Sequence, residues 1–197
     1  GMNRAYEVVG DGVNEMDAVA EIEYTIRKAG SETPPFYEGM LLSSGPDGAD
    51  IHARANSSKI CRGLVVVDLG ARYSGYYSDM TRTIPVGALT KDEKKVLGFV
   101  KNLELEVIDR IGVGIKSSEL HSYVDKRIKK RGYRFYHSAG HGVGLEIHEK
   151  PSLSDESKDI LKENMVFTIE PGIYIPRKFG VRFEDMVLLT RNGPRVL

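Results

Sequence analysis

Apolar residues recur every three or four positions in three stretches of the chain, which is the spacing of an amphipathic helix. Each stretch is bounded by residues that start or stop helices, such as a side-chain cap before it or a glycine after it. These stretches predict helices that pack against a core. They are residues 15–29 between Asn14 and Gly30, a second from the Thr90–Glu93 capping box to Gly112, and a third from Ser117, as its cap, to Gly132.

Strand patterns lie between and after these helices. The run Leu64–Leu69 is apolar and β-branched, as in a strand buried on both faces, and Tyr76–Thr81 is expected to return antiparallel to it. A short strand is expected at Tyr133–Tyr136, and a strand-rich block covers residues 165–189. The order helix, hairpin, helix, helix, hairpin predicts an α+β fold made of two similar αβ halves.

The overall composition narrows the class of function. Of the 197 residues, 41% are hydrophobic and 28% are charged, which is ordinary for a globular protein. The 28 basic residues balance the 28 acidic ones, so no broad basic surface predicts nucleic-acid binding, and no apolar run is long enough to cross a membrane. We therefore expect a cytoplasmic protein with a small partner. Cys61, beside a buried strand, is expected to be an inert core thiol.

Two aspartates lie in the arms of the predicted first hairpin. If the turn is centred between Tyr73 and Ser74, Asp68 and Asp79 become direct cross-strand neighbours, with Cβ atoms about 4.5–5.5 Å apart. A bulge near Gly75 would shift this register by one residue. Two buried carboxylates so close together repel, so either one is protonated or a cation lies between them, and we favour a divalent cation.

The strand-rich block near the C-terminus repeats this arrangement. A turn centred on Arg177 makes Glu170 and Glu184 opposed residues of a second hairpin. Nearby, Arg182 can neutralise only one of the four acids. Four carboxylates with so few basic partners predict a site for two divalent ions of the manganese, cobalt or zinc kind, with His141, in a glycine-flanked turn, as the nitrogen donor.

Five short segments carry most of this chemistry: Val67–Gly70, Gly75–Thr83, Gly140–Glu149, Ile169–Gly172 and Gly180–Asp185. They resemble the motifs of the pita-bread metallopeptidases, a family that includes methionine aminopeptidase, aminopeptidase P and Xaa-Pro dipeptidase. The resemblance covers nearly the whole chain. It implies a pita-bread fold with two pseudo-symmetric αβ halves and antiparallel sheet, and a single catalytic domain over residues 1–197.

Position by position, the resemblance implies roles for individual side chains. A hydroxide bridging two metal ions would attack the peptide bond, with Glu170 as the proton shuttle. The substrate pocket would be lined by His52, His137 and His148, of which His52 and His148 would donate hydrogen bonds to the oxyanion. Apart from the resemblance, Arg182 lies two residues before Glu184 and so on the same strand face, from which it either neutralises a buried carboxylate or reaches the substrate. The implied ligands of two ions, manganese or cobalt before zinc, are Asp68, Asp79, His141, Glu170 and Glu184.

Within the family, the short interval between Glu170 and Glu184 resembles Xaa-Pro dipeptidase and aminopeptidase P. We therefore expect an exopeptidase that hydrolyses the bond before proline in small peptides. The N-terminal domain usual in that branch, which contributes to the dimer, is absent from residues 1–197, and a homodimer stays open. The alternatives are a methionine aminopeptidase, a metal-free enzyme like the creatine-hydrolysing relatives, and a non-catalytic binding module like the histone-chaperone relatives. The five retained ligands argue against the last two.

Overall fold

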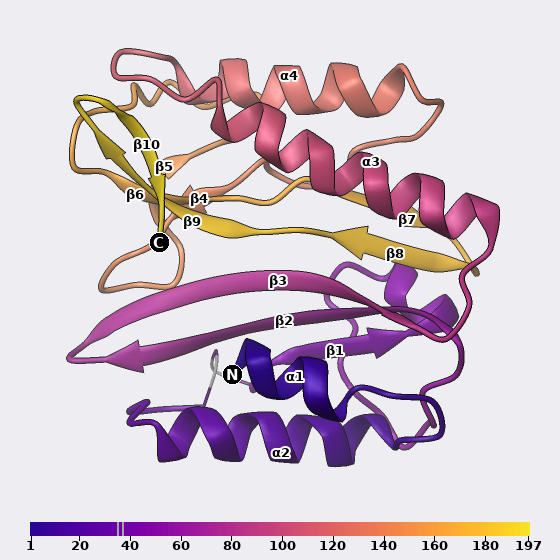
Figure 1. The fold of residues 1–197 in the computed structure, drawn as a ribbon. Coiled ribbons are helices and arrows are strands. Elements are labelled where there is room, and N and C mark those ends of the chain that lie inside the picture. The colour runs from indigo at the N-terminus through magenta and orange to yellow at the C-terminus, as the bar shows by residue number, and fades with distance from the viewer. Residues whose placement is uncertain (35, 37) are drawn as a thin grey trace.

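Helices cover two opposite sides of a layer of strands in the computed structural model, which describes residues 1–34, 36 and 38–197. Figure 1 shows α1 and α2 against the strands of the N-terminal half, and α3 and α4 on the far side, over the strands of the C-terminal half. In this described part of the chain, no helix is long and apolar enough to cross a membrane.

The three helices expected from the apolar spacing are present. The side chain of Asn14 caps α2, and Thr90 and Glu93 form the reciprocal capping box of α3. Ser117 is already the first residue of α4, and its hydroxyl donates to Ser157 instead of capping the helix, so that cap was wrongly predicted. The helices are α1 Met2–Val8, α2 Glu15–Lys28, α3 Lys91–Ile108 and α4 Ser117–Lys129, with a short 3₁₀ helix at Gly45–Ala49.

The strands form antiparallel ladders. One sheet has the order β1-β2-β3, a second has the order β10-β9-β6-β4-β5, and β7 pairs with β8. In the N-terminal half the strands are β1 Leu41–Ser44, β2 Gly63–Tyr73 and β3 Tyr76–Val86. In the C-terminal half they are β4 His141–Gly142, β5 Glu149–Ser152, β6 Val166–Ile169, β7 Gly172–Ile175, β8 Phe179–Arg182, β9 Asp185–Thr190 and β10 Gly193–Val196.

The two halves repeat the same main-chain hydrogen bonds. Each helix pair is tied to the segment that leads into its strands by three bonds of matching direction. In the first half, the N–H of Gly12 donates to the carbonyl of Ile60, that of Ile60 to Val13, and that of Glu15 to Ser58. In the second half, the N–H of Gly114 donates to the carbonyl of Leu161, that of Leu161 to Ile115, and that of Ser117 to Asp159. This repetition agrees with the expected pair of similar αβ halves.

The register of the first hairpin differs from the sequence prediction by two residues. Asp68 lies opposite Thr81, and Asp79 lies opposite Gly70, so the aspartates are diagonal neighbours. The loop consists of Ser74 and Gly75, both with positive φ, as a tight two-residue hairpin turn requires, and the ladder runs on without a bulge. Because a shift of two residues preserves the face of a strand, both carboxylates still point the same way.

The second hairpin has the predicted register. Ile175 pairs with Phe179 around a turn centred on Arg177, and the same alignment continues between β6 and β9, where Ile169 pairs with Asp185. Glu170 and Glu184 fall between these ladders, at the positions the alignment opposes. The ladder is interrupted there, which leaves both side chains free to face the other half of the molecule.

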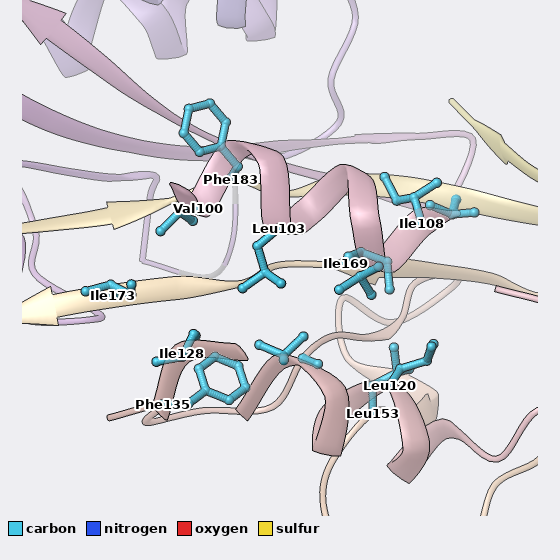
Figure 2. Packing of buried hydrophobic residues seen from close by; sticks show 14 of the residues in the cluster. Val100, Leu103, Ile108, Leu120, Ile128, Phe135, Leu153, Ile169, Ile173 and Phe183 are labelled. Atoms are coloured by element: carbon cyan, nitrogen blue, oxygen red, sulfur yellow. The ribbon is translucent and has the colours of Figure 1, made fainter. Parts of the chain in front are cut away.

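Two apolar clusters, one in each half, hold the strands in place. In the larger one, shown in Figure 2, Leu103 of α3 and Ile128 of α4 pack over Ile169 and Ile173 of the C-terminal strands. The smaller cluster packs α1 and α2 on β1–β3 through fully buried residues such as Ile22. The helices therefore brace each set of strands from outside.

Two further predictions fail on local structure. Residues 133–136 form an irregular segment after α4. Their burial alternates as in a strand, with Phe135 buried and Tyr136 exposed, but no neighbouring strand pairs with them among the described residues. Cys61 is exposed, since the buried part of the strand begins only at Gly63.

Candidate metal centre

A cavity of about 990 Å³ collects polar side chains from both halves of the molecule. All five residues expected to bind metal line it, together with the three histidines and the arginine expected at the substrate pocket. Its lining includes Asp68, Asp79, His141, Glu170 and Glu184, and also His52, His137, His148 and Arg182.

The carboxylates reach this cavity from different strands. Asp68 and Asp79 come from β2 and β3, and both are buried. Glu184 is fixed against β3, because its main chain exchanges two hydrogen bonds with Thr81 and its Oε2 accepts a 2.6 Å hydrogen bond from the Thr81 hydroxyl. Glu170 follows β6, and its main-chain N–H donates to the carbonyl of Ala139.

His141 is flanked in the chain by two positions, 140 and 142, at which only glycine fits. A Cβ at Gly140 would come within 1.9 Å of the Thr168 carbonyl oxygen, and one at Gly142 within 2.2 Å of the Lys150 carbonyl oxygen. This close approach brings His141 Nε2 to 3.6 Å from Asp79 Oδ2 and 3.6 Å from Glu170 Oε1. A ring that donates its Nδ1 proton to the Gly142 carbonyl, 3.1 Å away, presents the Nε2 lone pair to those acids.

Burial and mutual repulsion disfavour ionised acids in this cavity. The pKa of Asp79 is raised well above its ordinary value by desolvation and then by the charges of Glu184, Asp68 and Glu170. Desolvation and Glu184 likewise raise the pKa of Glu170 well above its ordinary value, and desolvation and Asp68 raise the pKa of Glu184 to about 7. The pKa of His141 is lowered to about 4 by desolvation.

The donor set fits divalent cations. Within the described residues, Asp68 Oδ1 and Asp79 Oδ1 are buried oxygens without a hydrogen-bond partner, which is costly unless another group satisfies them. Ligand atoms of Asp79, His141 and Glu184 all lie within 4.8 Å of one another. Carboxylate oxygens with one imidazole nitrogen suit hard or borderline divalent ions, and such ions would offset the repulsion between the acids.

One carboxylate already has a cationic partner. Arg182 is buried, and its Nη2 lies 2.5 Å from Asp68 Oδ2. Burial opposes the charge on Arg182, but Tyr174 and the surrounding carboxylates raise its pKa well above the ordinary value. Of the two roles expected for Arg182, neutralising a buried acid is therefore the one that the geometry favours.

The three pocket histidines differ in their surroundings. His52 and His148 are exposed at the cavity, and the ring of His148 lies edge-on to that of His141 with centroids 4.2 Å apart. In contrast, His137 uses both ring nitrogens internally: Nδ1 lies 2.7 Å from the Ser138 carbonyl, and Nε2 lies 3.0 Å from the Tyr174 hydroxyl. This arrangement suits His137 for holding Tyr174 better than for contacting a substrate.

Sequence reasoning overlooked three polar residues that support the site. Thr81 donates to Glu184, and Thr168 bonds the main chain of His141. Tyr174 accepts from Arg182 Nη1 at 2.9 Å and faces His137. A signal for them existed, because Thr81, Thr168 and Tyr174 each lie an even number of residues from an acid on the same stretch of extended chain, and even spacing places side chains on one face.

The comparisons with known proteins agree with this geometry. A model of metallopeptidase family M24 matches residues 1–191. The Xaa-Pro dipeptidase of Pyrococcus furiosus is 43% identical over 98% of this chain and 56% of its own length, and the solved structure of that prolidase superposes with a TM-score of 0.95, at 42% identity over 99% of this chain and 58% of that one.

Two other solved structures are similar. The X-Pro aminopeptidase of Thermotoga maritima has a TM-score of 0.92 at 35% identity and covers 99% of this chain and 55% of that one. A methionine aminopeptidase of Rickettsia prowazekii has a TM-score of 0.87 at 20% identity, covering 99% of this chain and 90% of that one, which shows the shared fold alone.

The chain spans little more than half the length of the curated prolidase that it matches. The match nevertheless includes both halves of the fold and every strand that contributes an acid to the cavity. The fold is the expected pita-bread fold, and the family implies divalent metals at this cluster. The chain belongs to metallopeptidase family M24.

Proposed function

We propose that this chain is a dinuclear metallopeptidase that hydrolyses the peptide bond before proline in Xaa-Pro dipeptides or short peptides. The observation that carries the proposal is the convergence of four carboxylates and His141 on one cavity, with buried oxygens of Asp68 and Asp79 that lack partners within the described chain. The similarity to an Xaa-Pro dipeptidase and an X-Pro aminopeptidase supports proline as the second residue of the substrate.

The proposed metal ligands are the four acids and the one histidine already located at the cavity. Two divalent ions held there, manganese or cobalt in the first instance, would supply an activated water and polarise the scissile carbonyl. Zinc is compatible with the same donors. The ligands are Asp68, Asp79, His141, Glu170 and Glu184.

Glu170 is the proposed proton carrier. Its Oε1 lies 3.4 Å from the Thr168 hydroxyl and 3.6 Å from His141 Nε2, and the residue lines the cavity together with the other three acids. Burial and the neighbouring charge of Glu184 raise the pKa of Glu170, which makes its ionised carboxylate a stronger base, able to accept a proton from the attacking water and then pass it to the leaving nitrogen.

The exposed histidines are the proposed oxyanion donors. Both His52 and His148 line the cavity from loops of different halves, so each can donate from its own side to the oxygen of the tetrahedral species. A prolyl nitrogen carries no hydrogen, and its ring fixes φ, so a pocket for proline must recognise ring shape and carbonyl direction.

A peptide panel tests the proposal. We expect the metal-stripped protein, reloaded with Mn²⁺, to cleave Ala-Pro and Met-Pro faster than Ala-Ala and Met-Ala-Ser, with Asp79→Asn as the inactive control. A clear preference for Met-Ala-Ser would assign the chain to the methionine aminopeptidase branch. Binding of Mn²⁺ without cleavage of any peptide would assign it a binding role.

A further inference from the structure

Three charged residues lie behind Glu184, outside the lining of the cavity in the described structure. They come from three elements: Arg82 from β3, Asp185 from β9 and Glu104 from α3. Arg82 and Asp185 are mostly buried, and Glu104 is only 3% exposed. Burial of three ionisable groups is costly, so the contacts among them need a physical account.

Arg82 joins the main chains of the two strands that present the acids. Its Nη1 donates to the carbonyl of Glu184 at 2.6 Å and to the carbonyl of Thr81 at 2.9 Å. Its Nη2 lies 2.5 Å from Asp185 Oδ1. One guanidinium therefore ties together the residue pair Thr81 and Glu184, whose main chains and side chains are already hydrogen-bonded to each other.

Glu104 supports the carboxylate that holds Arg82. It lies in the middle of the buried face of α3, next to Asp185. Among the described residues, Glu104 Oε1 is a buried oxygen without a hydrogen-bond partner, so an ionised Glu104 beside Asp185 would be costly. Burial first, and then the charge of Asp185, raise the pKa of Glu104 to about 8, which favours a protonated carboxyl that can donate to Asp185 at neutral pH. The arrangement then has one anion, Asp185, opposite one cation, Arg82.

We propose that Arg82, Asp185 and Glu104 form a positioning clamp that fixes the main chain of Glu184 and so aims its carboxylate at the metal ions. The inference rests on the proposed function only in taking Glu184 as a ligand. Ligand groups must be held within about 0.5 Å of their working positions, and the partners that hold them affect metal affinity without touching the metal.

The planar guanidinium is essential to this clamp. Arg82 serves three oxygens that diverge in direction, two carbonyls and one carboxylate. A lysine ammonium keeps the charge but is a compact point donor on a flexible stem, so it cannot hold all three in one geometry. Arg82→Lys therefore removes the positioning while keeping a cation beside Asp185.

The test measures the affinity of the metal-stripped protein for Mn²⁺ by titration calorimetry, and kcat and KM for Ala-Pro separately. Arg82→Lys should weaken Mn²⁺ binding ~10–100-fold, the usual effect of losing an outer partner of a ligand. Glu104→Leu should weaken it too, whereas Glu104→Gln, whose amide still donates to Asp185, should retain wild-type affinity. Arg191→Lys is the matched control, because Arg191 pairs with Glu163 at an exposed site.

Several results would overturn the clamp. One is a folded Arg82→Lys variant that binds Mn²⁺ as tightly as wild type while unfolding at a lower temperature, which would make the ion pair purely structural. Another is equal loss of affinity in Glu104→Gln and Glu104→Leu. If Arg82→Lys does not fold, the comparison of Mn²⁺ affinity between Glu104→Gln and Glu104→Leu decides whether the clamp exists. A wild-type protein that binds Mn²⁺ but cleaves no Xaa-Pro dipeptide would refute the proposed activity. The ratio of each variant's Mn²⁺ affinity to that of wild type would still uphold or overturn the clamp.

Discussion

Replacing Glu184 by glutamine should stabilise the metal-free protein at pH 8. The pKa of this buried carboxyl is raised from 4.5 to about 7, first by burial and then by Asp68. Because one pKa unit corresponds to about 1.4 kcal/mol, the ionised acid costs the folded state about 3 kcal/mol above pH 7. Glutamine has the same size, can still accept from Thr81, and carries no charge, so it removes most of that cost.

The sign of the pH dependence follows from the same pKa values. Below pH 4.5, Glu184 is protonated in both the folded and the unfolded protein, and its burial costs no charge penalty. As the pH rises to about 7, the unfolded chain releases this proton before the folded protein does, so the free energy of unfolding falls. Buried His137 and His141, with pKa values lowered to about 3 and about 4 by desolvation, oppose this trend below about pH 6.5, where the unfolded histidines bind protons. The acids therefore dominate between pH 6.5 and 8, and the stability of the metal-free wild type should fall across that range.

Urea unfolding in the presence of a chelator measures both effects. Wild type should lose stability from pH 6.5 to 8, and Glu184→Gln should exceed it by up to about 3 kcal/mol at pH 8. Glu156→Gln, a substitution of an exposed acid, should match wild type throughout. A Glu184→Gln variant no more stable than this control at pH 8 would refute the claim that the acids are crowded without metal.

Three further predictions concern single side chains. Asp79→Asn should leave the fold intact by circular dichroism but weaken Mn²⁺ binding by more than the ~10–100-fold of an outer-partner variant, and loss of the fold would mean that the acid is structural. His148→Ala should lower kcat for Ala-Pro by ~10²–10³-fold with little change in KM, because an oxyanion donor acts only in the transition state, whereas a rise in KM alone would contradict that role. Tyr174→Phe should reduce stability to urea by about 1–3 kcal/mol, because Arg182 Nη1 and His137 Nε2 each lose a buried hydrogen-bond partner; unchanged stability would show that the contacts contribute nothing.

The face of each strand could be read from the sequence more securely than its exact register. Asp68 and Asp79 were expected to be directly opposed, yet they are diagonal, because the favourable left-handed turn falls at Ser74 and Gly75. The period of two in a strand makes the face insensitive to that shift, so the prediction that both acids meet in one site is unaffected. The second hairpin kept its predicted alignment, centred on Arg177.

Contacts between the halves could not be read from local pattern. The pairing of Arg182 with Asp68 depends on how the two halves meet, across 114 residues of sequence. The contact of His137 with Tyr174 likewise brings a segment 37 residues away onto the β7–β8 hairpin, where Tyr174 accepts from Arg182. The exposed Cys61 shows the same limit, since adjacency to a buried strand does not fix where burial begins.

Anomalous diffraction from crystals soaked in Mn²⁺ tests the central claim most directly, because it locates the metal independently of activity. The account predicts two peaks separated by ~3.5–4 Å, as in other two-metal hydrolases, within coordination distance of Asp68, Asp79, His141, Glu170 and Glu184. Peaks at separate places, or none near these five side chains at saturating Mn²⁺, would contradict it.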